Sequence, residues 1–418
     1  MSMPTISPES PTPLPDPKPA ITTADYETQE PATSIAKDFS IVVGGPAYDF
    51  LWRLRLVRFS LPNILRRIVV LVTLTWVPLL LLSLKDGLAF GNHVRIPLLF
   101  DFATYARFLL ALPLFVLAEI VIDPGIRLAV RQFVESGIVQ NGVLSDFENV
   151  LQRVQKLRDS PIPELILFVL AFLPVFLFEH EWSAGAISSW HTTTSGLTMA
   201  GWWYALFSAP LLRLIVYRWA FRYFVWAALI WRISRLDLVL TPTHPDRAAG
   251  LNFLCITQQT FGILFCALGC TFAGRMANSL AFEGAKIESF KFLMAGFVVL
   301  SLIVSLIPLA LVAPKLMIVR WKGLLEYSTL ANKYTRSFDR KWVHQVAEPS
   351  EPLLGTSDIQ SLADMANSFA CVDAMRIAPI SRSLVLLLVA QAALPLLPVI
   401  LMGTPAPELV RAVMKMIA

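Results

Sequence analysis

The chain has 418 residues, of which 56% are hydrophobic and 16% are charged, and its formal net charge is +5. Soluble globular proteins carry about 25% charged residues, so a chain this apolar could not cover its own surface with polar groups. Its 19 glycines and 4 cysteines exclude collagen-like chains and disulfide-rich scaffolds. The composition therefore predicts an all-α, polytopic bundle of transmembrane helices.

Residues 1–48 form a polar N-terminal tail, with eight prolines among the first 31 positions. Such a segment cannot bury enough apolar surface to offset the entropy lost on ordering. We therefore expect a disordered cytoplasmic tail followed by one membrane domain over residues 49–418.

Seven apolar stretches predict membrane-crossing helices, since about 20 residues span the hydrocarbon core. They cover approximately 66–84, 105–122, 163–178, 201–217, 251–273, 292–313 and 383–402. The sequence Asp123-Pro124-Gly125 predicts the end of the second helix. The Trp-rich stretch 219–240 either extends the fourth helix or lies separately under the headgroups, and its interspersed arginines favour the separate interfacial helix.

Lysines and arginines are concentrated in alternate connections between these stretches. Three basic connections contain the predicted cytoplasmic insertions, at residues 123–161, 218–250 and 315–382. The positive-inside rule therefore places the N-terminus in the cytoplasm, and an odd number of spans places the C-terminus outside. Within the last insertion, apolar residues recur at helical spacing over 358–369, which predicts a small amphipathic helix beginning near Asp358.

Glu119 lies well inside the second predicted span. A carboxylate at that depth costs on the order of 3 kcal/mol by insertion scales. Glu119 either faces the bundle interior as a proton or cation site, or lies near the cytoplasmic boundary and reaches water. Six of the seven predicted spans also contain proline, which tends to kink a helix. This pattern fits broken helices around a pathway, although proline is common in membrane helices generally.

The loop T-P-T-H-P-D-R-A-A-G at residues 241–250 carries further polar candidates. Asp246 is placed to cap the helix that follows, and Arg247 is expected to bind a neighbouring acid. Reading His244 and Asp246 as a catalytic pair would need a nucleophile or metal that the sequence does not display. The E-H-E group at residues 179–181 has ligand chemistry but no known metal spacing. We therefore expect no enzymatic activity, no cofactor and no bound metal.

Two motifs carry a resemblance to known proteins. The string L-T-P-T-H-P-D-R-A-A-G-L at residues 240–251 and D-I-Q-S-L-A-D at residues 358–364 resemble an uncharacterised family of multipass bacterial inner-membrane proteins. The resemblance covers about twenty residues. It implies a bacterial inner membrane, and it implies that His244, Asp246, Arg247 and Asp358 lie in family features that meet in space. It implies no activity.

The expected function is a channel or transporter for an ion or small solute, with Glu119 in the pathway and the two cytoplasmic motifs as a gate or collar. One alternative is a membrane scaffold or sensor that docks an unidentified cytoplasmic partner. Another is a membrane-embedded enzyme acting on lipid or envelope precursors. The expected partners are the lipid bilayer and, in a homo-oligomer, further copies of the chain. Nucleic acid is not expected, because the basic residues flank apolar runs instead of forming a patch.

Overall fold

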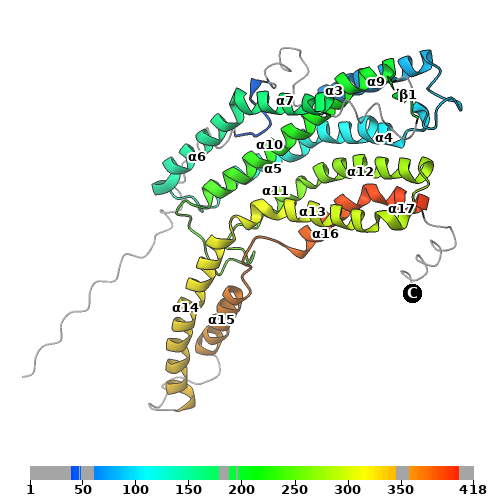
Figure 1. Ribbon diagram of the computed structural model, residues 1–418. Coiled ribbons are helices and arrows are strands. Elements are labelled where there is room, and N and C mark those ends of the chain that lie inside the picture. Colours follow the sequence, from blue (N-terminus) through cyan, green and yellow to red (C-terminus); the bar gives the residue numbers. More distant parts are fainter. Residues whose placement is uncertain are drawn as a thin grey trace, which may run out of the picture.

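The computed structural model describes residues 39–46, 48, 61–177, 188–193, 196–344 and 357–403. These residues are almost entirely helical (Figure 1), and the strands among them are the short antiparallel pair β1 (Thr192–Thr193) and β2 (Gly196–Leu197). The predicted all-α fold is confirmed.

The helices follow one another along the chain with few long connections. In order they are α3 (Leu61–Lys85), α4 (Phe102–Tyr105), α5 (Leu112–Glu135), α6 (Asn141–Asp159), α7 (Pro161–Leu177), α9 (Met199–Trp203), α10 (Ala209–Ile233), α11 (Phe253–Thr260), α12 (Gly262–Phe282), α13 (Lys291–Ala310), α14 (Ala313–Phe338), α15 (Ser357–Asp373), α16 (Arg382–Ala393) and α17 (Leu397–Gly403). Short 3₁₀ turns are η2 (Leu98–Phe100), η5 (Ile287–Phe290) and η7 (Leu394–Leu396), and π-helical segments are η3 (Ala106–Ala111), η4 (Tyr204–Ser208) and η6 (Asp339–Val343).

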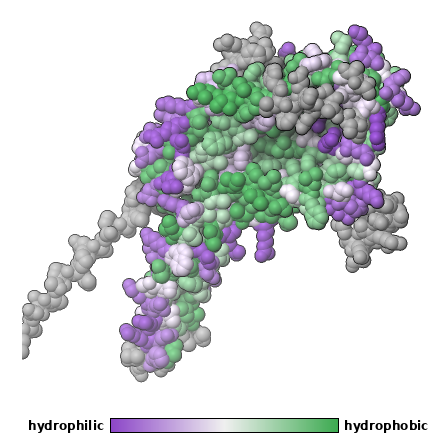
Figure 2. Space-filling view, viewed as in Figure 1, coloured by the Kyte–Doolittle hydropathy of each residue, from purple (hydrophilic) through white to green (hydrophobic). Residues whose placement is uncertain are grey.

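Six helical segments of the described chain are long and apolar enough to cross a membrane. They are Asn63–Lys85, Phe102–Glu135, Met199–Ile233, Phe253–Phe282, Ile287–Ala310 and Arg382–Gly403. The space-filling view shows apolar side chains over the bundle and polar ones at its two ends (Figure 2). This is the construction of an integral, multipass membrane protein. The third predicted span corresponds to α7, a helix of 17 residues that is not among these six.

The preferred interpretation of the Trp-rich stretch is wrong. Residues 219–233 continue the fourth span in one helical segment, Met199–Ile233, instead of forming a separate interfacial helix. Two of its indoles turn into the protein, where Trp219 Nε1 donates to the carbonyl of Phe115 at 2.8 Å and Trp226 Nε1 to Gln258 Oε1 at 3.2 Å, whereas Trp231 is 44% exposed. The polar atoms of these two indoles are therefore satisfied without reaching the headgroups.

The predicted end of the second helix is also wrong, because α5 runs through Pro124 to Glu135. Helix α11 packs against this part of α5, and Thr257 Oγ1 donates to the Gly125 carbonyl at 3.1 Å. The buried side chain of Asp123 accepts hydrogen bonds from Ser40 and from Arg127, one turn onward. Tertiary packing thus overrides the local stop signal, and the predicted cytoplasmic insertion 123–161 begins inside a helix.

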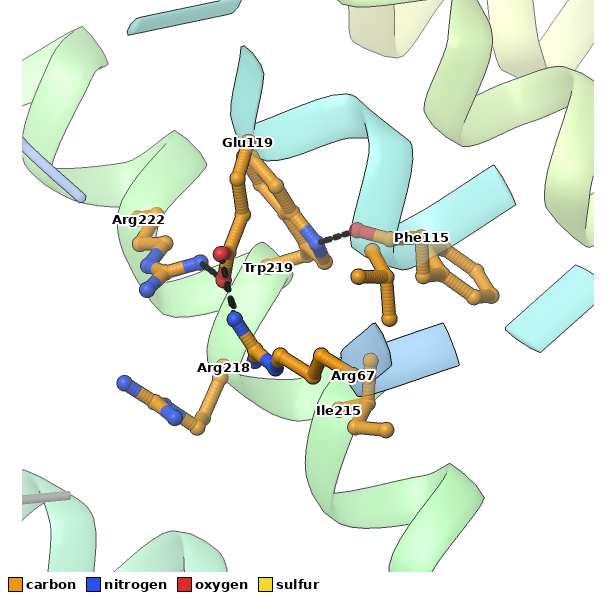
Figure 3. A pocket seen from close by; sticks show the side chains of 8 residues that line it. Arg67, Phe115, Glu119, Ile215, Arg218, Trp219 and Arg222 are labelled. Carbon is orange, nitrogen blue, oxygen red and sulfur yellow. Dashed lines mark hydrogen bonds and ion pairs between the residues drawn. The ribbon is translucent and has the colours of Figure 1, made fainter. Parts of the chain in front are cut away.

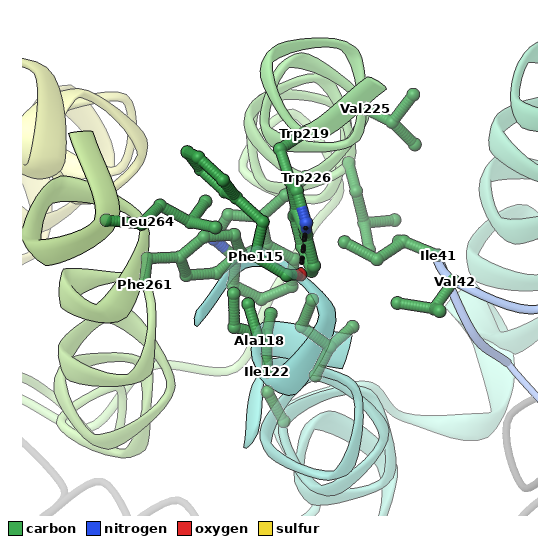
Figure 4. Close-up of a cluster of buried hydrophobic side chains, with 14 of the residues drawn as sticks. Ile41, Val42, Phe115, Ala118, Ile122, Trp219, Val225, Trp226, Phe261 and Leu264 are labelled. Carbon is green, nitrogen blue, oxygen red and sulfur yellow. Dashed lines mark hydrogen bonds between the residues drawn. The ribbon is translucent and has the colours of Figure 1, made fainter. Parts of the chain in front are cut away.

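The end of the predicted tail belongs to the bundle. Residues 1–38 lie outside the described residues, but Phe39, Ile41 and Val42 are buried. Ile41 and Val42 lie beside α5 and α10 in the core (Figure 4). Arg158 of α6 donates to the Ser40 carbonyl and thereby fixes this segment. The prediction of disorder is therefore wrong for residues 39–42, which are buried against the bundle.

Helices α14 and α15 form an arm. They lie side by side and extend from one end of the bundle, crosswise to its long helices (Figure 1). Helix α6 and the N-terminal ends of α11 and α16 lie toward the same end. We call this the arm end of the bundle.

Candidate functional site: an arginine-lined pocket

The carboxylate of Glu119 lies between two guanidinium groups inside the bundle (Figure 3). Arg67 Nη1 is 2.6 Å from Glu119 Oε2, and Arg222 Nη1 is 3.0 Å from Oε1. The three residues come from α3, α5 and α10, and each is at most 7% exposed. The Glu119 side chain is therefore buried inside the bundle, where it has two charged partners.

A cavity of about 10 Å³ adjoins this ion cluster. Its lining residues, which we call the arginine pocket, are Arg67, Phe115, Val116, Glu119, Ile215, Arg218, Trp219 and Arg222. That volume suits one water-sized species. The Nε atom of Arg67 is buried and has no hydrogen-bond partner within the described part of the chain.

Cations outnumber anions around the pocket. Three guanidinium groups line it against one carboxylate, and the carboxylate of Glu164 on α7 lies 3.9 Å from Arg218. Among these residues of the described chain, even with Glu164 included, one positive charge is left in excess. Because charges interact more strongly where water is excluded, this excess favours an anion in the pocket.

Aromatic packing holds Arg222 in place beside Glu119. Its guanidinium lies 4.9 Å from the centre of the Trp219 ring, which provides a favourable cation–π contact in a desolvated setting. Arg222 also donates to the Val42 carbonyl at 3.3 Å. The N-terminal segment therefore closes one side of the ion cluster.

Sequence reasoning found Glu119 but missed its partners. Assigning residues 218–250 to a cytoplasmic insertion places Arg218 and Arg222 outside the membrane and therefore away from Glu119. The usable signal was the acid itself, since a buried carboxylate requires a cationic partner. Arg67, near the start of the first predicted span, was a candidate for that cationic partner.

A second polar cluster lies at the opposite end of the bundle and was not predicted as a site. The buried side chain of Asp101 accepts from Trp190 Nε1 at 2.8 Å, from Asn278 Nδ2 at 2.7 Å, and from Thr104. Burial raises the pKa of Asp101, but these hydrogen bonds outweigh it and hold the pKa below its ordinary value. Burial lowers the pKa of nearby His191 to about 4, so this histidine is neutral at pH 7.

Two π-helical segments meet at this second polar cluster around Asp101, which we call the far cluster. Arg107 of η3 donates from Nη1 to the hydroxyl of Tyr204, which lies in η4, at 2.5 Å. The His191 ring stacks on Tyr204, with ring centres 6.0 Å apart. Single π-helical turns inside α-helices are frequent at functional sites, which singles out this contact between two spans.

The loop at residues 241–250 is built around the carboxylate of Asp246. Its oxygens accept from the backbone N–H groups of Ala248 at 2.7 Å, Gly250 at 3.1 Å and Asn252 at 3.0 Å, the last at the start of α11. Burial raises the pKa of Asp246, but the backbone hydrogen bonds hold it below its ordinary value. His244 Nδ1 lies 2.9 Å from the same carboxylate.

Arg247 does not make the ion pair expected of it. Its side chain is exposed and has no acidic partner in the described ranges. Arg376 holds the loop instead, donating from Nη2 to the Asp246 carbonyl at 2.7 Å and from its backbone N–H to the Arg247 carbonyl at 2.8 Å. The backbone of Arg247, with a φ of 56° in the left-handed region, presents its carbonyl to this contact, while its side chain points to solvent.

The two sequence motifs, at residues 240–251 and 358–364, lie toward opposite ends of α15. Asp358 lies at the outer tip of the arm, where it accepts from Lys341 Nζ at 2.8 Å and from Trp342 Nε1 at 2.9 Å. The loop at residues 241–250 lies near the other end of α15. Gly323 of α14 is in close contact both with Pro242 of this loop and with Val372 near the C-terminal end of α15. The 17 residues of α15 separate these ends by about 25 Å. Asp358 and Asp246 are therefore not parts of one site.

Comparisons of this chain with protein-family models, curated proteins and solved structures find no match. The arginine pocket and the far cluster lie along the same pair of spans, Phe102–Glu135 and Met199–Ile233. The E-H-E group at residues 179–181 lies outside the described residues.

Proposed function

We propose that this protein is a channel or transporter of the bacterial inner membrane, with a cytoplasmic N-terminus, and that its solute is a small anion. The observation that carries the proposal is the arginine pocket, in which three guanidinium groups and one carboxylate line a cavity inside the bundle. Charged residues within membrane helices are costly and characteristically mark solute or ion pathways.

The charge of the pocket favours an anion over a cation. Glu119 was the expected cation site, but Arg67 and Arg222 already neutralise its carboxylate. A cation entering there would meet the remaining positive charge, whereas an anion would gain from it and could accept from the unpartnered Nε of Arg67. Pores lined by arginine or lysine select anions on the same principle.

The far cluster supports a route along the same helices. Arg107 provides a second cationic group inside the Phe102–Glu135 span, where it donates to the Tyr204 hydroxyl and interacts electrostatically with the Asp101 carboxylate. The cavity has room for about one water, so passage requires the helices to separate. The π-helical segments η3 and η4 are the places where the regular backbone pattern of these two spans is already interrupted.

Flux into liposomes tests this function. Purified protein should accelerate the entry of chloride or nitrate, followed with an entrapped halide-sensitive dye, and should leave potassium entry at the level of protein-free liposomes. The Arg218→Gln variant should lower anion entry about tenfold, which corresponds to about 1.4 kcal/mol of lost interaction.

Arg66→Gln is the matched control, because it removes the same charge from an exposed side chain beside Arg67. It should leave anion entry unchanged. Anion entry no faster than in protein-free liposomes, or faster entry of potassium than of chloride, would refute the proposed function.

A further inference from the structure

Helix α14 is placed to lie along the membrane surface. It begins three residues after α13 ends, directly at the arm end of a membrane-spanning segment. It then runs crosswise to the spans (Figure 1), and its 26 residues extend about 39 Å. A helix that leaves a span in this direction follows the plane of the adjacent leaflet.

One face of α14 exposes large apolar side chains. Met317, Ile318, Trp321 and Leu325 are 45%, 64%, 64% and 66% exposed. Their spacing places them on one side of the helix. The opposite side packs on α15 and on the loop at residues 241–250, where Gly323 is buried. We call the four exposed residues the apolar face of α14.

Basic residues border this face. Helix α14 contains five basic residues and one acidic residue, Glu326. At 100° per residue, Lys322 falls beside the apolar face, where it lies 3.8 Å from Glu326, and Lys333 and Arg336 follow on the same side of the helix, about two and three turns beyond Leu325. An apolar face that includes tryptophan, bordered by lysine and arginine, is the pattern of helices that lie in the interface of an anionic bilayer.

We infer that the apolar face of α14 inserts into the headgroup region of the adjacent leaflet, with its basic edge on anionic lipid headgroups. The occupant is a lipid surface because the face begins at the end of a membrane span and because its border has the charge that complements anionic headgroups. This inference is independent of the proposed anion pathway. It makes the arm a part of the protein that senses lipid charge.

A fluorescent label at position 321 tests the inference in the full-length protein. Cys255, Cys266, Cys270 and Cys371 are first replaced by alanine, and Trp321→Cys is labelled with an environment-sensitive fluorophore. The protein is placed in detergent, in phosphatidylcholine liposomes, and in liposomes that also contain phosphatidylglycerol. Quenchers attached to lipid tails and aqueous iodide then report where the label lies. Glu326→Cys, on a different side of the same helix, is the matched control.

The expected result is at least threefold stronger lipid-borne quenching at position 321 than at position 326, increasing when phosphatidylglycerol is present. Adding Lys333→Gln and Arg336→Gln should abolish that increase. Equal quenching by iodide at both positions in every bilayer would overturn the inference. Shielding of position 321 from both iodide and the lipid-borne quenchers would also overturn it, because protein would then cover the face. If lipid-borne quenching at position 321 is the same with and without phosphatidylglycerol, the inferred contact between the basic edge and anionic headgroups is overturned.

Discussion

Replacing Glu119 by glutamine should lower the free energy of unfolding by about 3–5 kcal/mol. The substitution leaves Arg67 and Arg222 buried without the carboxylate that lies 2.6 and 3.0 Å from them. A buried charge that loses its counter-charge keeps its desolvation cost and loses its compensation. Thermal unfolding of the purified protein in detergent measures the effect. A Glu119→Gln variant that unfolds at the same temperature as the wild type would contradict this stabilising role of the ion cluster.

The triple variant Arg67→Met/Glu119→Leu/Arg222→Met separates stability from function. Replacing a whole buried ion cluster by apolar residues of similar size is often neutral or stabilising. The triple variant should therefore melt close to the wild type, yet it should lose most of the anion entry because the pocket retains only Arg218 as a cation. Undiminished anion entry by a stable triple variant would show that the pocket is not on the pathway.

Replacing Asp101 by alanine should cost about 3 kcal/mol of stability, because the buried donors Trp190 Nε1 and Asn278 Nδ2 would lose their acceptor. The same change should loosen the segment at residues 188–193, since Trp190 anchors it to the bundle. Thermal unfolding and the rate of proteolysis in this segment are the measurements.

Asp86→Ala is the control for that substitution. Asp86 is an exposed aspartate just beyond the end of α3, so its removal should change stability by less than 0.5 kcal/mol. Equal melting of the Asp101→Ala and Asp86→Ala variants would contradict the structural importance of the far cluster.

The spans could be predicted because the signal is local. Each needs only an apolar run of sufficient length, and six such runs become membrane-length helices. The Trp-rich stretch shows where local reasoning ends. Its apolar positions surround the helix, so composition alone does not distinguish an interfacial helix from a buried one. The deciding partners, Phe115 and Gln258, lie elsewhere in the chain.

The candidate site was predictable only through Glu119. An acid inside an apolar run is conspicuous, but its partners lie 52 and 103 residues away in the sequence. Asp101 was not conspicuous, because it stands just before the predicted second span and could be taken for an exposed residue. Its partners Trp190 and Asn278 are 89 and 177 residues distant. Periodicity carries no information about contacts of this kind.

If the protein carries anions, the arginine pocket must be accessible to anions from water. Ile215 lines the pocket and carries no charge (Figure 3), so Ile215→Cys in the cysteine-free protein leaves every arginine in place. Such access predicts that in liposomes an anionic thiol reagent modifies this cysteine at least tenfold faster than a cationic reagent of the same size. A cysteine that reacts only with an uncharged, lipid-soluble reagent, or equally with both charged ones, would contradict it.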